Sequence, residues 1–398
     1  MNLAAVNLAA VNRRRAASAA VLLALLLPFP LAAAGTSAAA DSPSAAAETR
    51  RTTVELPRPT GRFSVGQETL HLVDRSRTDP WARSGPRELM VTMRYPAQRG
   101  SGGPVRYLTR EEARLLLVDQ GLDGAIPVET LAGTAAHSRS HARPVAGRYP
   151  LIVLSPGFTV PRATLTALAE DLASRGYVVA AVDHAYESAG TAFPGGRVLE
   201  CLACEKVESA GGMQAVSDTR ARDVSFLLDR LTGRDPAWRH AGLIDASRIA
   251  MAGHSIGGAS AAAAMAADPR VRAGVNMDGG LATPVPQAGL GGRPFMLLGA
   301  QGRSPGGNPS WDRDWPKLDG WKRWITFADS GHFTFSDFPV IGDRLGIPSP
   351  EAPLSGARSV ELTRRYVGAF FDQHLGGTPQ PVLDGPAADA PEVRFHTP

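Results

Sequence analysis

One serine stands in a pattern that favours nucleophilic chemistry. Ser255 occupies the centre of Gly-x-Ser-x-Gly, between Gly253 and Gly257. An apolar run ends at Gly253 and an alanine-rich run begins at Gly257, so we expect a strand, a tight turn and a helix. Such a turn holds the hydroxyl clear of the backbone, and the helix N-terminus favours developing negative charge. The pattern predicts that Ser255 is a nucleophile, with a plain tight turn as the alternative.

His332 is the histidine best placed to act as a base. It follows the apolar run 321–328 and comes after the serine in the chain. Functional groups collect at the carboxyl ends of parallel strands, so a histidine in this loop can reach the serine. The alternative is a solvated loop histidine. His184 follows another apolar run and Phe333 adjoins the base. His254 lies within the serine turn, where its side chain should point away from the reactive side of the serine. We expect these three residues as neighbours of the substrate site.

Asp278 is the candidate acid, because it directly follows the apolar run 273–277. A carboxylate there can accept the second imidazole N–H, fix its tautomer and stabilise the imidazolium. The next run, which ends at residue 298, has no carboxylate at its tip. The alternative acids follow in a later loop: Asp312, Asp314 and Asp319.

An oxyanion hole needs two backbone N–H groups. The residue after the nucleophile, Ile256, supplies one, and an early strand-to-helix loop supplies the other. In that loop Pro156 has no N–H, whereas Phe158 has one. Ile256 and Phe158 are therefore the predicted donors. Asp183, at the end of an earlier apolar run, receives a supporting role.

The N-terminus is typical of an export signal. Three arginines at 13–15 precede an apolar run over 16–34, and small-residue cleavage sites follow. Two prolines interrupt the run, which favours cleavage over a membrane anchor. We expect residues 1–40 to be a signal and leader of a secreted protein, exported by the general or the twin-arginine route. Residues 41–60 have the composition of a disordered linker.

Cys201 and Cys204 are the two cysteines of the chain. An exported protein favours a disulfide between them, since a zinc site would need more ligands and a redox motif its own strand and helix. The spacing of the later aspartates matches no calcium loop. The sequence therefore predicts neither metal nor cofactor.

The composition of the chain restricts the class of protein and the kinds of partner that it could have. The chain has 398 residues, 43% of them hydrophobic, and a formal charge of +4 without a basic stripe. This is typical of a globular protein that does not bind nucleic acid. We expect a monomer whose partner is an ester substrate or a lipid–water interface. Apolar side chains that could contact such an interface are Leu115–Val118, Trp311 and Trp315, with a place in the core as the alternative.

Continuous apolar runs alternate with helical patterns, which predicts a parallel sheet with helices on both faces. Two alternating segments, 70–74 and 88–96, predict antiparallel strands at the N-terminal edge. We expect an α/β catalytic domain over 61–377 and a mobile, Pro-rich tail over 378–398. The apolar runs are 151–154, 177–182, 249–252, 273–277, 294–298 and 321–328, and the helical patterns are 163–175, 212–232, 257–267 and 360–375.

Taken together, these motifs resemble one family. Gly253-His254-Ser255-Ile256-Gly257-Gly258, then Asp278, then Ser330-Gly331-His332 with Phe335-Ser336-Asp337-Phe338, look like the type II (plasma) platelet-activating factor acetylhydrolases and related secreted actinobacterial lipases. The resemblance implies an α/β-hydrolase fold without a metal. It also implies Ser255, Asp278 and His332 as nucleophile, acid and base. One departure is Pro156, where mammalian members have a histidine.

The sequence thus predicts a secreted serine hydrolase of short-acyl or lipid esters. Three alternatives stay open: a cutinase-like polyester hydrolase, an acyltransferase, and a non-catalytic binding protein on a hydrolase scaffold. The first two would use the same three residues. The intact set of serine, acid and base argues against the third.

Overall fold

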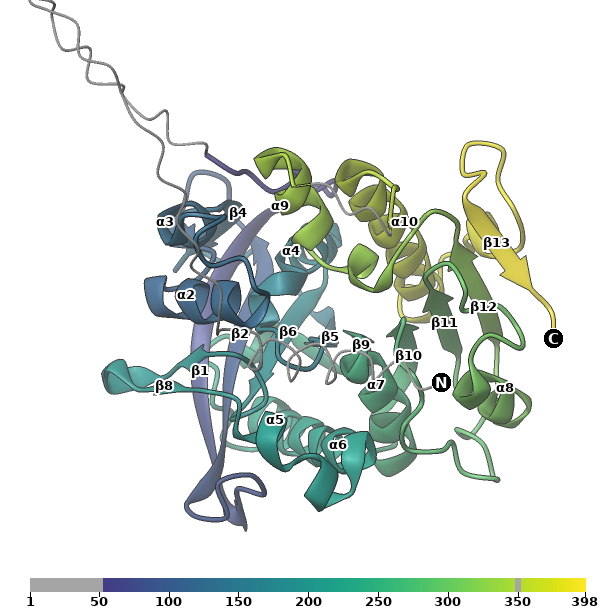
Figure 1. The fold of residues 1–398 in the computed structure, drawn as a ribbon, viewed down its shortest axis with the longest axis horizontal. Helices are drawn as coiled ribbons and strands as arrows, with labels where there is room; N and C mark the ends of the chain where they lie inside the picture. Colours follow the sequence, from purple (N-terminus) through teal and green to yellow (C-terminus); the bar gives the residue numbers. More distant parts are fainter. Residues whose placement is uncertain (1–52, 348–351) are drawn as a thin grey trace, which may run out of the picture. The chain divides into compact units, whose positions relative to one another are not determined.

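An eleven-stranded sheet organises the part of the chain that the computed structural model describes, residues 53–347 and 352–398. Its strands follow the order β13-β12-β11-β10-β9-β5-β6-β2-β1-β4-β3 (Figure 1). The predicted export signal and residues 41–52 of the predicted linker lie outside the described residues. Within those residues, no helix combines the length and apolar character needed to cross a membrane.

The six predicted apolar runs form the parallel centre of the sheet. Their side chains are buried on both faces, which explains why the sequence shows continuous apolar runs instead of alternation. The prediction of a mostly parallel sheet is confirmed. These strands are β5 (Tyr149–Ser155), β6 (Val178–His184), β9 (Ile244–His254), β10 (Val271–Met277), β11 (Phe295–Gly299) and β12 (Lys322–Phe327).

The two sheet edges carry the antiparallel strands. On the N-terminal side β6 pairs with β2, and β2 with β1, as the alternating segments predicted. At the other edge β12 pairs with β13. The edge strands are β1 (Ser64–Thr78), β2 (Pro86–Ala97), β3 (Gly103–Arg106), β4 (Ala135–Ser140) and β13 (Val393–His396), and a separate two-stranded ribbon pairs β7 (Thr191–Ala192) with β8 (Val198–Leu199).

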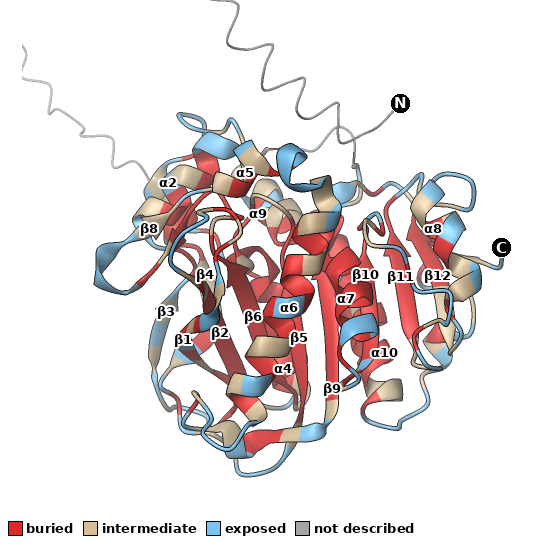
Figure 2. Cartoon of the chain, turned by 90° about the horizontal axis from the view of Figure 1, so that it is seen from below, coloured by how far each residue is buried: buried red, intermediate tan, exposed pale blue. Residues whose placement is uncertain are grey.

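Helices cover both faces of the sheet and bury it (Figure 2). Apolar side chains of α6 and α7 pack in one core cluster, and those of α4 and α10 pack in another. The main helices are α4 (Thr166–Arg175), α6 (Gly212–Thr232), α7 (Ile256–Ala267) and α10 (Gly356–His374). The shorter ones are α2 (Arg110–Asp119), α3 (Val128–Ala132), α5 (Leu202–Lys206), α8 (Pro309–Asp314) and α9 (Phe338–Leu345).

Two terminal segments differ from expectation. Residues 378–398 are not a mobile tail, because β13 extends the sheet and Leu383 and Val393 are buried. In the described part of the predicted linker, residues 53–60, Val54 and Leu56 are buried in the core cluster beneath α2 and α3. Both segments carry isolated apolar residues among polar and proline residues, so composition alone misses their packing.

Candidate active site

Ser255 lies in the turn between β9 and α7, with backbone angles φ 55° and ψ −127°. A non-glycine residue rarely adopts a positive φ, so the surrounding structure must hold this strained turn. Close packing explains the flanking glycines. A Cβ on Gly253 would lie 2.2 Å from the carbonyl carbon of Gly257, and a Cβ on Gly257 would lie 2.0 Å from the Ser155 carbonyl oxygen.

Ser255, His332 and Asp278 lie in one hydrogen-bonded chain. The Nε2 atom of His332 lies 3.0 Å from Ser255 Oγ, and its Nδ1 atom lies 2.5 Å from Asp278 Oδ2. The Asp278 carboxylate accepts the Nδ1–H, which leaves Nε2 free to take the serine proton. The His332 side chain is 40% exposed and that of Asp278 only 2%, so the base meets solvent while the acid is buried.

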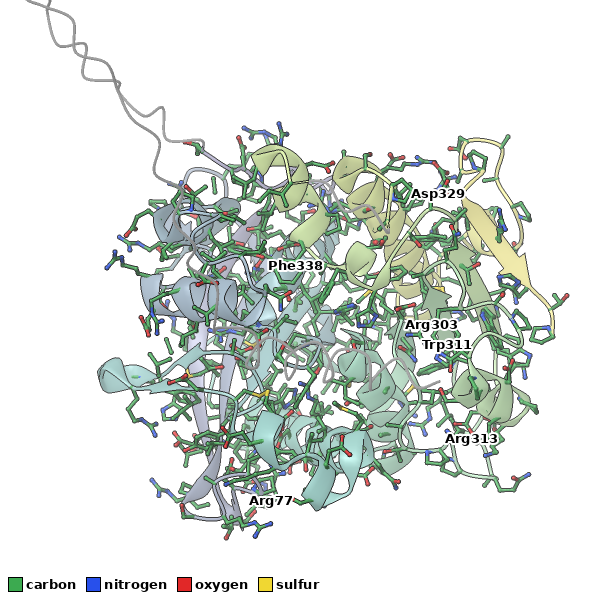
Figure 3. All side chains as sticks on the ribbon, in the orientation of Figure 1. Arg77, Arg303, Trp311, Arg313, Asp329 and Phe338 are labelled. Carbon is green, nitrogen blue, oxygen red and sulfur yellow. A yellow bond between two sulfur atoms is a disulfide. The ribbon has the colours of Figure 1, made fainter. Side chains whose placement is uncertain are left out.

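Asp278 receives further bonds from the loop after β11. Its Oδ1 accepts the Ala300 N–H at 2.8 Å and lies 3.2 Å from Nε of Arg303. Figure 3 labels Arg303 near Trp311. Burial alone would raise the pKa of Asp278, but the hydrogen bond from His332, the charge of Arg303 and the Ala300 amide lower it below its ordinary value. The carboxylate is therefore ionised at neutral pH. Arg303 was not among the predicted site residues, although it follows the strand tip that has no carboxylate of its own.

The two predicted oxyanion donors flank the serine. Ile256 is the first residue of α7, and Phe158 lies in the loop after β5. Neither N–H has a hydrogen-bond acceptor within the described chain. Phe158 also packs, partly exposed, against the apolar cluster that contains Ile256 and Ala259. Within the described residues, both N–H groups therefore lack a protein acceptor.

His254 contacts the base, His332, through a hydrogen bond and through its ring. Its Nε2 donates to the backbone carbonyl of His332 at 2.7 Å, and the two rings are 4.7 Å apart between centroids. Burial and the adjacent His332 lower the pKa of His254 to about 3, so it stays neutral. The expectation that His254 borders the substrate is wrong, because its side chain is fully buried.

His184 is also buried, so its expected place beside the substrate is wrong as well. Its Nδ1 lies 2.8 Å from Asp223 Oδ2, and its Nε2 lies 3.1 Å from Ser155 Oγ. Asp183, the predicted supporting residue, pairs with Arg162 just beyond the Phe158 loop. Phe333, in contrast, is 37% exposed and its ring centroid lies 5.4 Å from that of His332.

The alternative acids serve other loops. Asp312 accepts the Gly306 N–H, Asp319 accepts the Leu290 and Gly292 N–H groups, and Asp314 pairs with Arg313 and Lys317. Of the side chains proposed for an interface, Trp311, Leu116 and Leu117 are buried in the core, and Val118 is half exposed.

Cys201 and Cys204 form a disulfide, with Cα atoms 5.3 Å apart. The bridge lies at the start of α5. Cys201, Leu202 and Met213 pack against the cluster of Ile256 and Phe158, so the bridged segment adjoins the candidate site.

Comparisons with known proteins agree with this architecture. The family described as platelet-activating factor acetylhydrolase, isoform II, matches residues 126–196 and 237–347, which include the serine, the acid, the base and both candidate N–H donors. A curated relative from Arthroderma benhamiae, a probable 1-alkyl-2-acetylglycerophosphocholine esterase, is 30% identical and aligns over 85% of this chain and 93% of its own. The chain belongs to the isoform II platelet-activating factor acetylhydrolase family.

Two further relatives of this acetylhydrolase family member extend the comparison. The platelet-activating factor acetylhydrolase of Canis lupus familiaris is 24% identical and aligns over 58% of each chain. A solved ferulic acid esterase from Streptomyces cinnamoneus is 46% identical, with a TM-score of 0.77, over 86% of this chain and 99% of its own. The predicted α/β-hydrolase fold is confirmed, and the chain is a carboxylic ester hydrolase.

Proposed function

We propose that this chain is an exported serine ester hydrolase that forms its acyl-enzyme on Ser255. The carrying observation is the hydrogen-bonded chain from Ser255 Oγ to His332 Nε2 (3.0 Å) and from His332 Nδ1 to Asp278 Oδ2 (2.5 Å). The strained turn at Ser255 and the two free N–H groups beside it support the same assignment. Export remains a proposal from residues 1–40, and we propose a monomer.

In the first half-reaction Ser255 Oγ attacks the ester carbonyl carbon while His332 Nε2 takes the hydroxyl proton. Asp278 stabilises the imidazolium, and the N–H groups of Ile256 and Phe158 stabilise the oxyanion. The tetrahedral intermediate then collapses: the bond to the alcohol oxygen breaks, and His332 gives its proton to the leaving alcohol. Water, deprotonated by His332, then attacks the acyl carbonyl carbon. The bond to Ser255 Oγ breaks, His332 returns the proton to Oγ, and the carboxylic acid leaves.

Short-acyl and lipid esters are the first substrate class. Support comes from the family and from the Arthroderma benhamiae relative, whose name describes an esterase of an acetylated alkyl glycerophosphocholine. The His332 side chain is 40% exposed, so water reaches the acyl-enzyme readily.

Hydroxycinnamoyl esters are a second class, favoured by two aromatic side chains beside the serine. Phe158 packs against the cluster of Ile256, and the exposed Phe333 contacts His332. Flat aromatic acyl groups pack well against such rings. The related Streptomyces cinnamoneus protein is a ferulic acid esterase at 46% identity.

The test is a hydrolysis profile of the purified protein beside its Ser255→Ala variant. The panel holds an acetylated alkyl phospholipid, p-nitrophenyl acetate and palmitate, a triglyceride, methyl ferulate and a polyester film. Preference for acetyl esters supports the first class, and preference for methyl ferulate supports the second. Preference for the film would make the protein a polyester hydrolase, and activity that persists in Ser255→Ala would overturn the mechanism.

A further inference from the structure

The loop that carries Phe158 is anchored on its C-terminal side by hydrogen bonds, two of which come from backbone N–H groups of the loop. The backbone N–H of Thr159 donates to the Glu187 carbonyl at 3.0 Å. The backbone N–H of Arg162 donates to Asp183 Oδ1 at 2.6 Å. Both contacts lie C-terminal to Phe158, so they fix where the loop leaves the site.

Arg220, on α6, anchors the residues of the loop that precede Phe158. Its Nη1 donates to the Pro156 carbonyl at 2.5 Å and to Ser155 Oγ at 3.1 Å. Its Nε donates to Glu187 Oε2 at 2.7 Å, so the guanidinium is held in place from behind. The Arg220 side chain is 1% exposed, which means that these bonds form away from competing water.

Ser155 is also the end of a second, buried serine–histidine–aspartate chain. The Asp223 carboxylate accepts the Nδ1–H of His184 at 2.8 Å, which leaves Nε2 of His184 as an acceptor. Ser155 Oγ, 3.1 Å away, donates its hydrogen to that Nε2 and accepts from Arg220. The His184 Nδ1–H and the Ser155 O–H each have one acceptor in this network, and Ser155 Oγ accepts one N–H of Arg220. These bonds fix the orientation of the Ser155 side chain.

We propose that Arg220, with the Ser155–His184–Asp223 chain behind it, acts as a positioning group for the oxyanion hole. The guanidinium holds the Pro156 carbonyl, whose oxygen also lies close to the serine turn, since a Cβ on Gly257 would lie 2.7 Å from it. Since the peptide unit is planar, fixing this carbonyl fixes the peptide plane that joins Pro156 to Gly157, the residue directly before Phe158. Phe158 lies between the two anchored points and its N–H has no acceptor in the described residues.

This inference deepens the proposed function and depends on it. An oxyanion exists only in the transition state and the tetrahedral intermediate, so a misdirected Phe158 N–H should reduce turnover and leave substrate binding unchanged. A network that merely stabilised the fold would lower stability without changing turnover of the folded enzyme. The two roles therefore differ in what they do to kcat.

The test compares Arg220→Lys with Arg222→Lys in the full chain. Lysine keeps the charge at 220 but cannot bond Pro156, Ser155 and Glu187 together, and Arg222 is an exposed residue of the same helix. Removal of an oxyanion donor costs about 10²–10³ in kcat, so we expect Arg220→Lys to lower kcat about 10- to 100-fold with KM within about twofold. Arg222→Lys should match the parent protein.

A boronic acid that forms a tetrahedral adduct on Ser255 gives an independent readout. Its inhibition constant should rise by the same factor by which kcat/KM falls. Ser155→Ala, which keeps the Pro156 carbonyl, serves as a second variant should Arg220→Lys fail to fold. It should lower kcat about 3- to 10-fold, since its backbone anchor remains and a lost donor costs more.

Two results would overturn the inference. One is unchanged kcat in whichever variants fold, even with a lower melting temperature. The other is a rise in KM alone. If Ser255→Ala kept full turnover, the proposed function itself would fail, and the two failures are thereby distinguishable.

Discussion

The carboxylate of Asp278 bonds to Nδ1 of His332 at 2.5 Å, although strand β11 lies between the strands that carry the two residues. Asp278 follows β10 and His332 follows β12. The loop after β11 bridges this gap, since Ala300 donates its N–H to the same carboxylate and Arg303 neutralises it. The acid therefore follows β10 and not β11. The loop after β11 carries no acid of its own at the strand tip, and its residues bond the Asp278 carboxylate instead.

Asp278→Asn tests this arrangement. The amide favours the wrong imidazole tautomer and cannot stabilise the imidazolium, so we expect kcat to fall about 10³- to 10⁴-fold on p-nitrophenyl acetate. Asp312→Asn is the matched control, because Asp312 caps only the Gly306 turn. Equal activity of Asp278→Asn and the parent protein would move the acid elsewhere.

Arg87→Met tests the buried ion network behind the oxyanion loop. Arg87 is fully buried and pairs with Asp79, Glu187 and Asp223 at 2.7–2.9 Å. The variant leaves these carboxylates undercompensated, so the free energy of unfolding in urea should fall by about 3–5 kcal/mol. The control, Arg197→Met, breaks the more exposed pair with Glu88 and should cost less than about 1 kcal/mol. Similar losses of unfolding free energy in both variants would contradict the expectation that the buried ion pairs contribute more to stability than the exposed pair.

His374→Leu tests the acid sensitivity of the fold. Burial and the charge of Arg323 lower the pKa of His374 to about 4, between the rings of Trp321 and Phe370. The unfolded chain, with an ordinary histidine pKa near 6.5, binds a proton that the folded chain does not. Stability therefore falls as the pH falls from about 6.5 to 4, by at most about 1.4 kcal/mol per pH unit for this residue.

The variant should show a shallower dependence of unfolding free energy on pH across that window. His141→Gln, whose parent side chain is 77% exposed, is the control and should keep the parent slope. An unchanged slope in His374→Leu would contradict the assignment.

Replacing both Cys201 and Cys204 by serine tests the role of the disulfide. The bridge closes a very short loop, so its loss should cost about 2 kcal/mol or less in global stability. It holds Leu202 beside the cluster of Ile256 and Phe158, so we expect KM to rise a few-fold while kcat on p-nitrophenyl acetate is kept. A large loss of kcat with unchanged KM would be the contrary result.

Local patterns explain why much of the fold could be predicted. The central strands are short apolar runs because both faces of the sheet are covered. Gly253 is required by contacts within the turn itself, and Gly257 by the close approach of the Ser155 carbonyl at the end of β5. The serine turn and the ends of the neighbouring strands follow from this, and with them the positions of Asp278 and His332. Each of these signals lies within a few residues of the group it positions.

Long-range ion pairs could not be predicted in the same way. Arg87 and Asp223 are 136 residues apart, and their pairing follows no periodicity. His184 and His254 follow strand ends as functional histidines do, yet both are buried and bond to other protein groups. Strand β13 was missed because its few apolar residues follow a proline-rich stretch.

Ser255 carries the central claim, and active-site labelling tests it most directly. The purified protein is treated with a fluorophosphonate and digested, and the modified peptide is identified by mass spectrometry. We predict one phosphonyl adduct, on the peptide that contains Ser255, with loss of esterase activity in proportion to labelling and no adduct in Ser255→Ala. Labelling or ester hydrolysis that persisted in a folded Ser255→Ala variant would contradict the assignment.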